Sequence, residues 1–267
     1  MKTKVNFYWM LVLVLGLLVG PALTGTVVGS ELSGREIMEK VYNRDEGEDR
    51  ISTLRMVLVN KFGDQRSREI KQFEKNFGPV EKKIMFFLSP RDVRNTSFMN
   101  WSYDKERAHD DDQWIHLPAL RKVKRISAEN RGDYFMGSDF TYDDLGDRGL
   151  DDDRHTLLKT EEIKGETCYV VESVPREPNY MYAKTISWVM KDKWIGVKKE
   201  FYDSAGKLLK VLSVKKYQEI QGILTILEAQ MHNVQTGHKT IMETSDVQYN
   251  TGVKDDLFSE RMMRRGL

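Results

Sequence analysis

The sequence Lys184-Thr185-Ile186-Ser187-Trp188-Val189-Met190-Lys191 is the clearest indication of the fold in this chain. Large apolar residues occupy every second position, at Ile186, Trp188 and Met190. Successive side chains of a β-strand point to opposite faces, so residues two apart share a face. The run therefore predicts a strand with one strongly apolar face.

Runs of the same kind extend on both sides of this segment. They cover residues 51–61, 67–77, 80–88, 95–103, 113–117, 156–163, 167–174, 197–202, 208–217, 223–231 and 239–249. Short polar turns separate many of them, such as Lys164-Gly165-Glu166. Strands that follow one another without helices between them predict an antiparallel meander of about ten to twelve strands. A sheet of that size tends to curl or close.

Short helices accompany these strands. Ser33 is a candidate N-cap, and Glu36 completes a capping box three residues later. An apolar stripe follows at Ile37, Met38, Val41 and Tyr42. Residues 118–123 predict a second short helix, and residues 255–258 resemble a helix start. The predicted fold class is α+β, mainly antiparallel β, in one mature domain of residues 31–267.

Composition narrows the function classes. The 267 residues carry 42 Lys and Arg against 41 Asp and Glu, for a net charge of +1. That balance argues against a general nucleic-acid binder, which usually has a basic excess. A single cysteine, Cys168, excludes an intramolecular disulfide framework. It stands in a strand-like run, so we expect it to be buried as a small hydrophobe and unreactive.

The N-terminus has the pattern of a secretory signal peptide. Lys2 and Lys4 precede an apolar run at residues 7–19, Pro21 breaks it, and small residues lead to Ser30. We therefore predict a signal peptide of residues 1–30, cleaved near Ser30, and an exported mature protein. Cleavage after Gly25 and an uncleaved membrane anchor are the alternatives. The apolar run is shorter than the roughly 20 residues of a spanning helix.

Residues 104–153 interrupt the meander with two distinctive blocks. The first reads Trp114-Ile115-His116-Leu117-Pro118-Ala119-Leu120-Arg121-Lys122-Val123-Lys124-Arg125-Ile126. The second reads Phe135-Met136-Gly137-Ser138-Asp139-Phe140-Thr141-Tyr142-Asp143-Asp144-Leu145. With the signal peptide, these blocks resemble the signature of the LolA-like family of bacterial outer-membrane lipoprotein-sorting proteins. The resemblance is to its periplasmic branch, which is similar to the treponemal LolA-like protein.

That resemblance implies an unclosed β-barrel, in which a strongly curved sheet wraps around helices and encloses a hydrophobic cavity. It implies a periplasmic carrier of lipid or lipoprotein acyl chains between the inner and outer membranes. An inner-membrane transporter of the RND type is a candidate partner. The alternative is a lipid- or lipoprotein-sensing adaptor of the same fold that regulates an envelope stress response. The third hypothesis for the function is an enzyme.

Two groups of residues are candidates for ligand contact. Seven large apolar side chains are the candidate cavity lining: Trp101, Trp114, Phe135, Met136, Phe140, Trp188 and Met190. For each one alone, ordinary core packing is the competing interpretation. The segment 118–145 is expected to be a lid, because its aromatic residues lie beside Gly137 and Gly146. A basic cluster is the candidate contact for anionic headgroups or an acidic partner: Arg121, Lys122, Lys124 and Arg125. A solvated face paired with nearby acids is its alternative.

The sequence predicts no catalytic residue, no cofactor and no metal site. It contains no Gly-x-Ser-x-Gly, His-Glu-x-x-His or P-loop motif. The histidines at 109, 116, 155, 232 and 238 do not have a known ligand spacing. The acidic runs at residues 110–112 and 151–153 do not match an EF-hand loop, so we expect solvated loop tips there.

Overall fold

The computed structural model describes residues 32–103 and 111–267. The predicted signal peptide, His109 and Asp110 lie outside the described residues. Leu32–Leu267 forms one compact unit, and the fold below is that of this unit.

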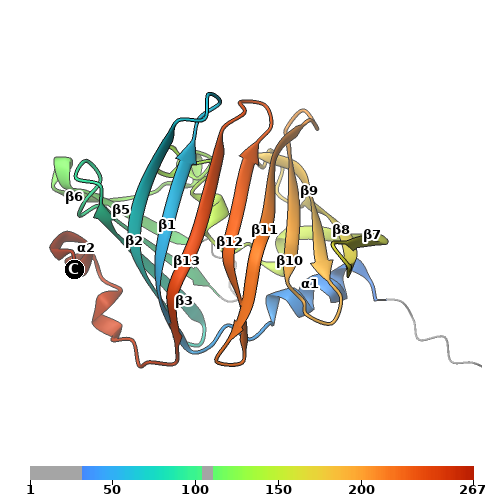
Figure 1. Cartoon of the computed structure of the whole chain (residues 1–267), viewed down its shortest axis with the longest axis horizontal. Coiled ribbons are helices and arrows are strands. Elements are labelled where there is room, and N and C mark those ends of the chain that lie inside the picture. Colours follow the sequence, from blue (N-terminus) through green and yellow to red (C-terminus); the bar gives the residue numbers. More distant parts are fainter. Residues whose placement is uncertain (1–31, 104–110) are drawn as a thin grey trace, which may run out of the picture. The chain divides into compact units, whose positions relative to one another are not determined.

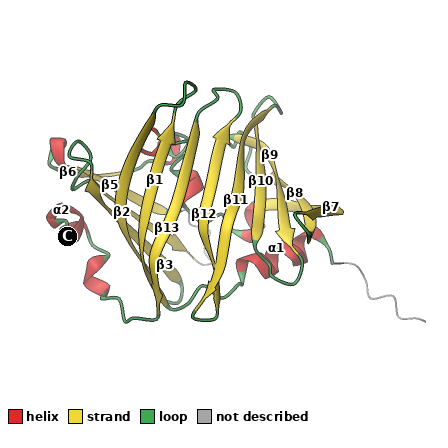
Figure 2. Cartoon of the chain, in the orientation of Figure 1, coloured by secondary structure: helices red, strands yellow, loops and turns green. Residues whose placement is uncertain are grey.

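A single antiparallel sheet makes up most of the described residues (Figures 1 and 2). Its strands are β1 (Asp49–Val59), β2 (Gln65–Asn76), β3 (Val80–Ser89), β4 (Ser97–Tyr103), β5 (Asp112–Leu117), β6 (Lys122–Arg125), β7 (Asp153–Ile163), β8 (Glu166–Pro175), β9 (Tyr182–Met190), β10 (Gly196–Asp203), β11 (Leu208–Ile220), β12 (Ile223–Asn233) and β13 (Lys239–Tyr249).

The strand order is β6-β5-β4-β3-β2-β1-β13-β12-β11-β10-β9-β8-β7. Two meanders are therefore joined where β1 pairs with β13, with Met56 opposite Met242. The two ends of the order, β6 and β7, do not pair with each other, so the sheet is strongly curved but open. The predicted antiparallel, unclosed fold is confirmed.

One strand was not predicted. Residues 118–123 form a short 3-10 helix only at Pro118–Leu120. Arg121 then has a left-handed backbone with φ 50°, which ends the helix. Lys122–Arg125 instead pairs with β5 as strand β6, and Trp114 lies opposite Arg125. The predicted helix is wrong beyond Leu120, and the described part of the sheet has thirteen strands.

Helix α1 (Gly34–Tyr42) covers one end of the concave face, over β7 and β8 (Figure 1). The predicted capping box is present, with Ser33 and Glu36 bonded to each other's backbone N–H. Ile37 is fully buried against Tyr169, Val171 and Val189. An amphipathic helix of this length is stabilised mainly by such packing.

The C-terminal segment covers the other face of the sheet at its opposite end. It contains a 3-10 helix at Asp255–Leu257 and helix α2 (Glu260–Arg265), which packs near β4, β5 and β6. Phe258 and Met263 are buried against Ile84, Phe86 and Met99. The helix start predicted at residues 255–258 is therefore a 3-10 turn, and the α-helix begins at Glu260.

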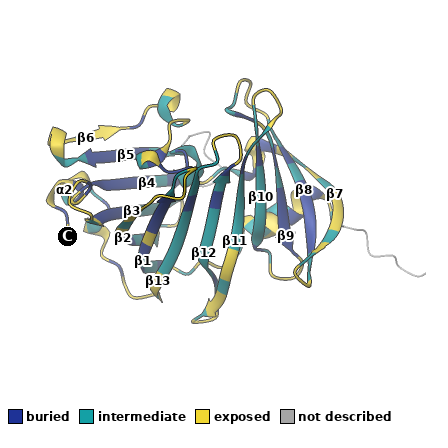
Figure 3. Ribbon diagram, turned by 45° about the horizontal axis from the view of Figure 1, so that its top comes forward, coloured by how far each residue is buried: buried dark blue, intermediate teal, exposed yellow. Residues whose placement is uncertain are grey.

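The concave face between these ends is covered by residues 126–152, which cross it without forming a strand. This central segment contains the 3-10 turns Ala128–Asn130, Phe135–Gly137, Asp143–Leu145 and Leu150–Asp152. Figure 3 shows exposed hairpin tips around a buried sheet interior. Cys168 lies in β8 and is fully buried, which confirms the predicted burial. Burial also raises the pKa of its thiol to about 11.

Within the described residues, no helix combines the length and the apolar character needed to cross a membrane.

Candidate functional site

The second sequence block is pinned to the concave face by its acidic residues. The Asp139 carboxylate accepts a hydrogen bond from Thr240 on β13 at 2.7 Å and pairs with His238 Nδ1 at 2.7 Å. The backbone N–H of Asp139 donates to the Thr240 hydroxyl at 2.9 Å. Since Asp139 and Thr240 are both buried, this contact fixes the segment 134–145 on the sheet.

Asp144 makes the second anchor. Its carboxylate pairs with the ammonium of Lys210 on β11 at 2.5 Å, and Lys210 is fully buried. Tyr182 on β9 donates its hydroxyl to the same carboxylate at 3.0 Å. Lys210 also donates to the carbonyl of Asp139 at 3.1 Å. Burial and the Asp144 charge raise the pKa of Tyr182 well above its usual range.

These anchors correct the expected lid. Lys122–Arg125 belongs to the sheet as β6, and Phe135 and Phe140 further on are buried rather than laid over an opening. Phe135 is fully buried with Phe87 and Phe98, while Phe140 packs against Tyr182, Phe201 and Met231. The segment is therefore an interior strut between the two meanders. Asp139 and Asp144 of the strut belong to a network of buried hydrogen bonds and ion pairs. Such a network favours one packing arrangement of the core over others.

Two adjoining cavities flank residues 143–150, which include the end of this strut (residues 134–145) and the chain that follows it. The first, with a volume of about 290 Å³, lies between α1 and the concave face and is called the apolar cavity here. Its apolar walls include Met38 and Val41 of α1, Phe140 of the strut, and Phe201, Leu212 and Met231 of the sheet. Volumes near 300 Å³ are at the small end of ligand sites in proteins.

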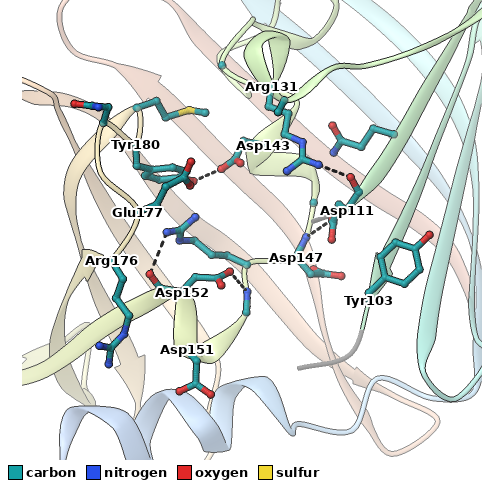
Figure 4. Close-up of a pocket in the computed structure, with 18 of the residues that line it drawn as sticks. Tyr103, Asp111, Arg131, Asp143, Asp147, Asp151, Asp152, Arg176, Glu177 and Tyr180 are labelled. Carbon is teal, nitrogen blue, oxygen red and sulfur yellow. Dashed lines mark hydrogen bonds between the residues drawn. The ribbon is translucent and has the colours of Figure 1, made fainter. Parts of the chain in front are cut away.

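The second, polar cavity has a volume of about 650 Å³ and is drawn in Figure 4. Charged side chains dominate its wall, among them Arg131, Asp143, Arg148 and Arg176. The Tyr180 hydroxyl donates to Asp143, as Figure 4 shows. The two cavities share Asp143, Gly146, Arg148, Gly149, Leu150 and Tyr180 in their walls.

Arg148 stands at this shared wall. Its guanidinium pairs with Asp153 at 2.9 Å and lies 3.9 Å from the centre of the Tyr180 ring. Gly149, the next residue, donates its N–H to Asp152 at 2.7 Å. A polar, partly solvated compartment thus adjoins an apolar one. This arrangement suits an amphiphile, with a polar group on one side and a hydrocarbon chain on the other.

The chain is similar to known proteins over most of its length. A family model described as "Uncharacterized protein" matches residues 80–265. An outer membrane lipoprotein-sorting protein domain from Vibrio parahaemolyticus is 36% identical, with a TM-score of 0.81. The match covers 87% of this chain and 98% of that one. This chain belongs to the LolA-like family of outer-membrane lipoprotein-sorting proteins.

Two further structures resemble this LolA-like chain. A DUF1329 family protein from Desulfovibrio piger is 28% identical, with a TM-score of 0.82, over 86% of this chain and 97% of the other. A LolA superfamily protein from Nitrosomonas europaea has a TM-score of 0.66 at 18% identity, over 86% and 99% of the two chains. The latter shows a shared fold alone. Among curated proteins, none matches this sequence.

The seven predicted lining residues of the LolA-like chain are distributed over four clusters. Only Phe140 lines the apolar cavity. Phe135 and Met136 pack at the β1–β4 end of the concave face. Trp101 and Trp114 pack against the C-terminal segment, and Trp188 and Met190 pack with Cys168. Lipid contact by these side chains stays a prediction.

Strand register explains why the two groups of tryptophans are apart from the cavity. On β9, Thr185 lines the apolar cavity and Val189 contacts α1. Trp188 and Met190 alternate with them and so lie on the opposite face. On β4, Phe98 meets Phe135 of the strut, and Trp101 lies on the other face. The sequence shows the alternation but not which face is concave.

The basic cluster lies at one edge of the sheet. Lys122 and Lys124 are exposed on β6, and Arg121 is exposed just before it. Arg125 pairs with Asp112 of β5. Charged residues on an edge strand also discourage pairing with another chain. Contact with headgroups or a partner therefore stays a prediction for these four residues.

The acidic runs are solvated, as expected, only in part. The Asp111 carboxylate accepts hydrogen bonds from Asn100 and Ser102, each at 3.0 Å, and burial raises its pKa. Asp153 is buried and paired with Arg148. Asp151 and Asp152 are exposed as expected, and Asp151 pairs with Arg35. Among residues 32–103 and 111–267, no cluster of three or more His, Cys, Asp or Glu is placed to hold a metal ion.

The sequence analysis did not identify Lys199 as a residue of the apolar cavity. This lysine on β10 lines the cavity beside Phe201 and Thr185. Burial lowers its pKa. In the strand pattern, Lys199 stands between Lys198 and Glu200 and looks like part of a solvated face. Its position opposite Ser187 on β9 and Leu212 on β11 is the feature that turns it inward.

Proposed function

We propose that this LolA-like protein is a periplasmic carrier that holds an acyl chain of a lipid or lipoprotein in the apolar cavity. The observation that supports the proposal is the cavity itself, which is bounded by α1 on one side and by the concave face on the other. Its family membership supports this class of cargo. The polar cavity next to it would hold the more polar part of the cargo.

The energetics suit a carrier without directional chemistry. Burial of one CH₂ group contributes about 0.8 kcal/mol. An acyl chain with ten buried methylenes would therefore gain about 8 kcal/mol before ordering costs. A cavity of about 290 Å³ takes part of a long chain, and the shared wall at Gly146 and Gly149 leads towards the polar cavity.

Filling the apolar cavity tests the proposal. Thr185 lines it from the concave face of β9 and is nearly buried. Thr185→Phe places an aromatic ring in the space, and Thr185→Val is the matched control of unchanged size. We expect Thr185→Phe to bind the neutral fluorescent probe N-phenyl-1-naphthylamine at least tenfold more weakly than Thr185→Val. Equal probe affinity in two folded variants would contradict the proposed cavity.

We also propose that the mature chain acts in the periplasm and exchanges cargo with an RND-type transporter. The support is the sequence pattern of residues 1–30 and the exposed lysines of β6. N-terminal sequencing of the protein from a periplasmic fraction should give a start near Glu31. A fractionated protein that still begins at Met1 would refute cleavage. Crosslinking from residue 122 in cells should capture an inner-membrane transporter, and capture of none would refute the partner.

A further inference from the structure

We infer that the acyl chain held in the apolar cavity ends in an anionic group, a carboxylate or a phosphate, which is bound by the ammonium of Lys199. This inference rests on the proposed carrier function and adds a class of cargo to it.

Lys199 is the cation of this cavity whose ammonium has no hydrogen-bond or ion-pair partner among the described residues. The centre of the Phe201 ring lies 5.1 Å from its Nζ atom. The surrounding wall is formed by Thr185, Phe201 and Leu212, which provide one hydroxyl and two apolar side chains.

The other charged groups in the wall are already engaged. Asp144 is paired with Lys210, and Asp153 with Arg148. The Asp143 carboxyl accepts the hydroxyl of Tyr180, and burial raises its pKa. These three carboxylates favour the charged form of Lys199 from a longer range, while Arg148 disfavours it.

His155, which also lines the cavity, is bonded through both ring nitrogens. Nδ1 contacts the Ser173 hydroxyl at 2.8 Å, and Nε2 contacts the Leu150 carbonyl at 2.9 Å. Neither nitrogen is left to receive a ligand. Among the described residues, Lys199 is therefore the basic group of this wall that has no hydrogen bond or ion pair to lose when it binds a ligand anion.

The neighbouring lysine shows what a surface lysine of the same strand does. Lys198 points to the opposite face of β10, where it pairs with Glu200 at 2.7 Å and lies 3.9 Å from the Trp188 ring centre. Lys199 has the same side chain in a less polar place. A partly buried charge without an ion-pair partner is less favourable than the same charge in water, so an anion carried in with the acyl chain would be bound by Lys199. A hydrogen bond to a charged group corresponds to about ten- to hundredfold in affinity.

Three ligands with the same chain test this inference: laurate, dodecyl phosphate and 1-dodecanol. Each is titrated, below its micelle concentration, against the full mature protein loaded with N-phenyl-1-naphthylamine. We expect at least one anion to displace the neutral probe at a concentration at least about tenfold lower than the alcohol does. Preference for laurate would identify a fatty-acid carboxylate, and preference for dodecyl phosphate would identify a lipid phosphate.

Three variants locate the effect. Lys199→Met should reduce the ratio of anion to alcohol affinity to about one, and Lys199→Arg should retain most of it. Lys198→Met is the matched control and should keep the wild-type ratio. Removal of an unpartnered amine should not destabilise the fold, which thermal denaturation will check. The comparison of ligands in wild-type protein does not depend on any variant.

The outcomes separate this inference from the proposed function. If the alcohol binds as tightly as both anions, or if folded Lys199→Met keeps the preference, the anionic cargo is refuted and the carrier function stands. If neither the probe nor any of the three ligands binds to the wild-type protein, both are refuted.

Discussion

Glu81 shows how far burial changes the acid–base behaviour of single residues in this protein. It lies on β3, opposite Ser102 of β4. Burial, together with the charge of Asp147, raises the pKa of its carboxyl to about 8 from the ordinary value of about 4.5. The next inward-facing residue of the strand, Lys83, pairs with Glu74 at 3.4 Å. Arg50 also pairs with Glu74, whose pKa is lowered to about 2 although burial opposes the shift.

The raised pKa of Glu81 predicts a pH-dependent stability. An acid whose pKa is higher in the folded state stabilises the fold below its unfolded pKa. It loses this contribution as pH rises through the folded pKa, here between about 4.5 and about 8. We expect Glu81→Gln to raise the melting temperature by at least about 2 °C at pH 8. The gain should be smaller at pH 5, as measured by differential scanning calorimetry. An equal gain at both pH values would contradict the assignment.

Lys210 is expected to be essential to stability. Lys210→Met leaves the buried Asp144 carboxylate without its cation, and breaking one side of a buried pair costs about 3–5 kcal/mol. Urea denaturation should show this loss in the free energy of unfolding. Lys216→Met, at an exposed position of the same strand, is the control and should change it by less than about 0.5 kcal/mol. Similar losses in the two variants would show that the strut is not anchored by this pair.

At the scale of elements, the close packing of helix α1 on strand β7 depends on a glycine, Gly34. A Cβ atom at Gly34 would lie 2.6 Å from the backbone of Thr156 and Leu157 on β7. Alanine ordinarily stabilises a helix relative to glycine by about 0.5–1 kcal/mol. We nevertheless expect Gly34→Ala to destabilise the protein by about 1–3 kcal/mol, because the helix must move off the sheet. Glu39→Ala, on the exposed side of α1, is the control for helix propensity. Stabilisation by Gly34→Ala would show that the contact can relax.

The edge strand β6 carries the predicted membrane contact. Each lysine near an anionic surface contributes about 1 kcal/mol to binding. Reversal of two charges in Lys122→Glu with Lys124→Glu should therefore weaken binding to vesicles with 30% anionic lipid at least about tenfold in a flotation assay. The double variant Lys215→Glu with Lys216→Glu has the same charge change on β11. Equal loss in both pairs would indicate a general charge effect and no specific contact of β6.

The elements themselves show what the sequence can predict. Twelve of the thirteen strands follow from alternation and turns, because local backbone preference and the apolar period agree there. Strand β6 could not be predicted, because Lys-Val-Lys-Arg contains one apolar residue and so shows no apolar alternation. The strut could not be predicted for another reason: the residues of β9, β11 and β13 that anchor its Asp139 and Asp144 lie from about forty to a hundred residues away in the sequence.

At the scale of the whole fold, one arrangement explains both the architecture and the cavities. The pairing of β1 with β13 joins two meanders, and the strut from Tyr134 to Leu145 packs against both of them. The β1–β4 end is filled by Phe135 and its aromatic neighbours. The other end is filled less completely, and the apolar cavity lies there between the strut and α1. Which side chains face this cavity follows from register across distant strands, so Lys199 could not be found from spacing alone.

The central claim is that the apolar cavity carries an acyl chain. Native mass spectrometry of the mature protein, purified without detergent, tests it most directly. We predict a population of the wild-type and Thr185→Val proteins with the added mass of one acyl-chain amphiphile, and loss of that population in Thr185→Phe. A wild-type protein without any lipid mass, or a Thr185→Phe variant that carries the same lipid to the same extent, would contradict the claim.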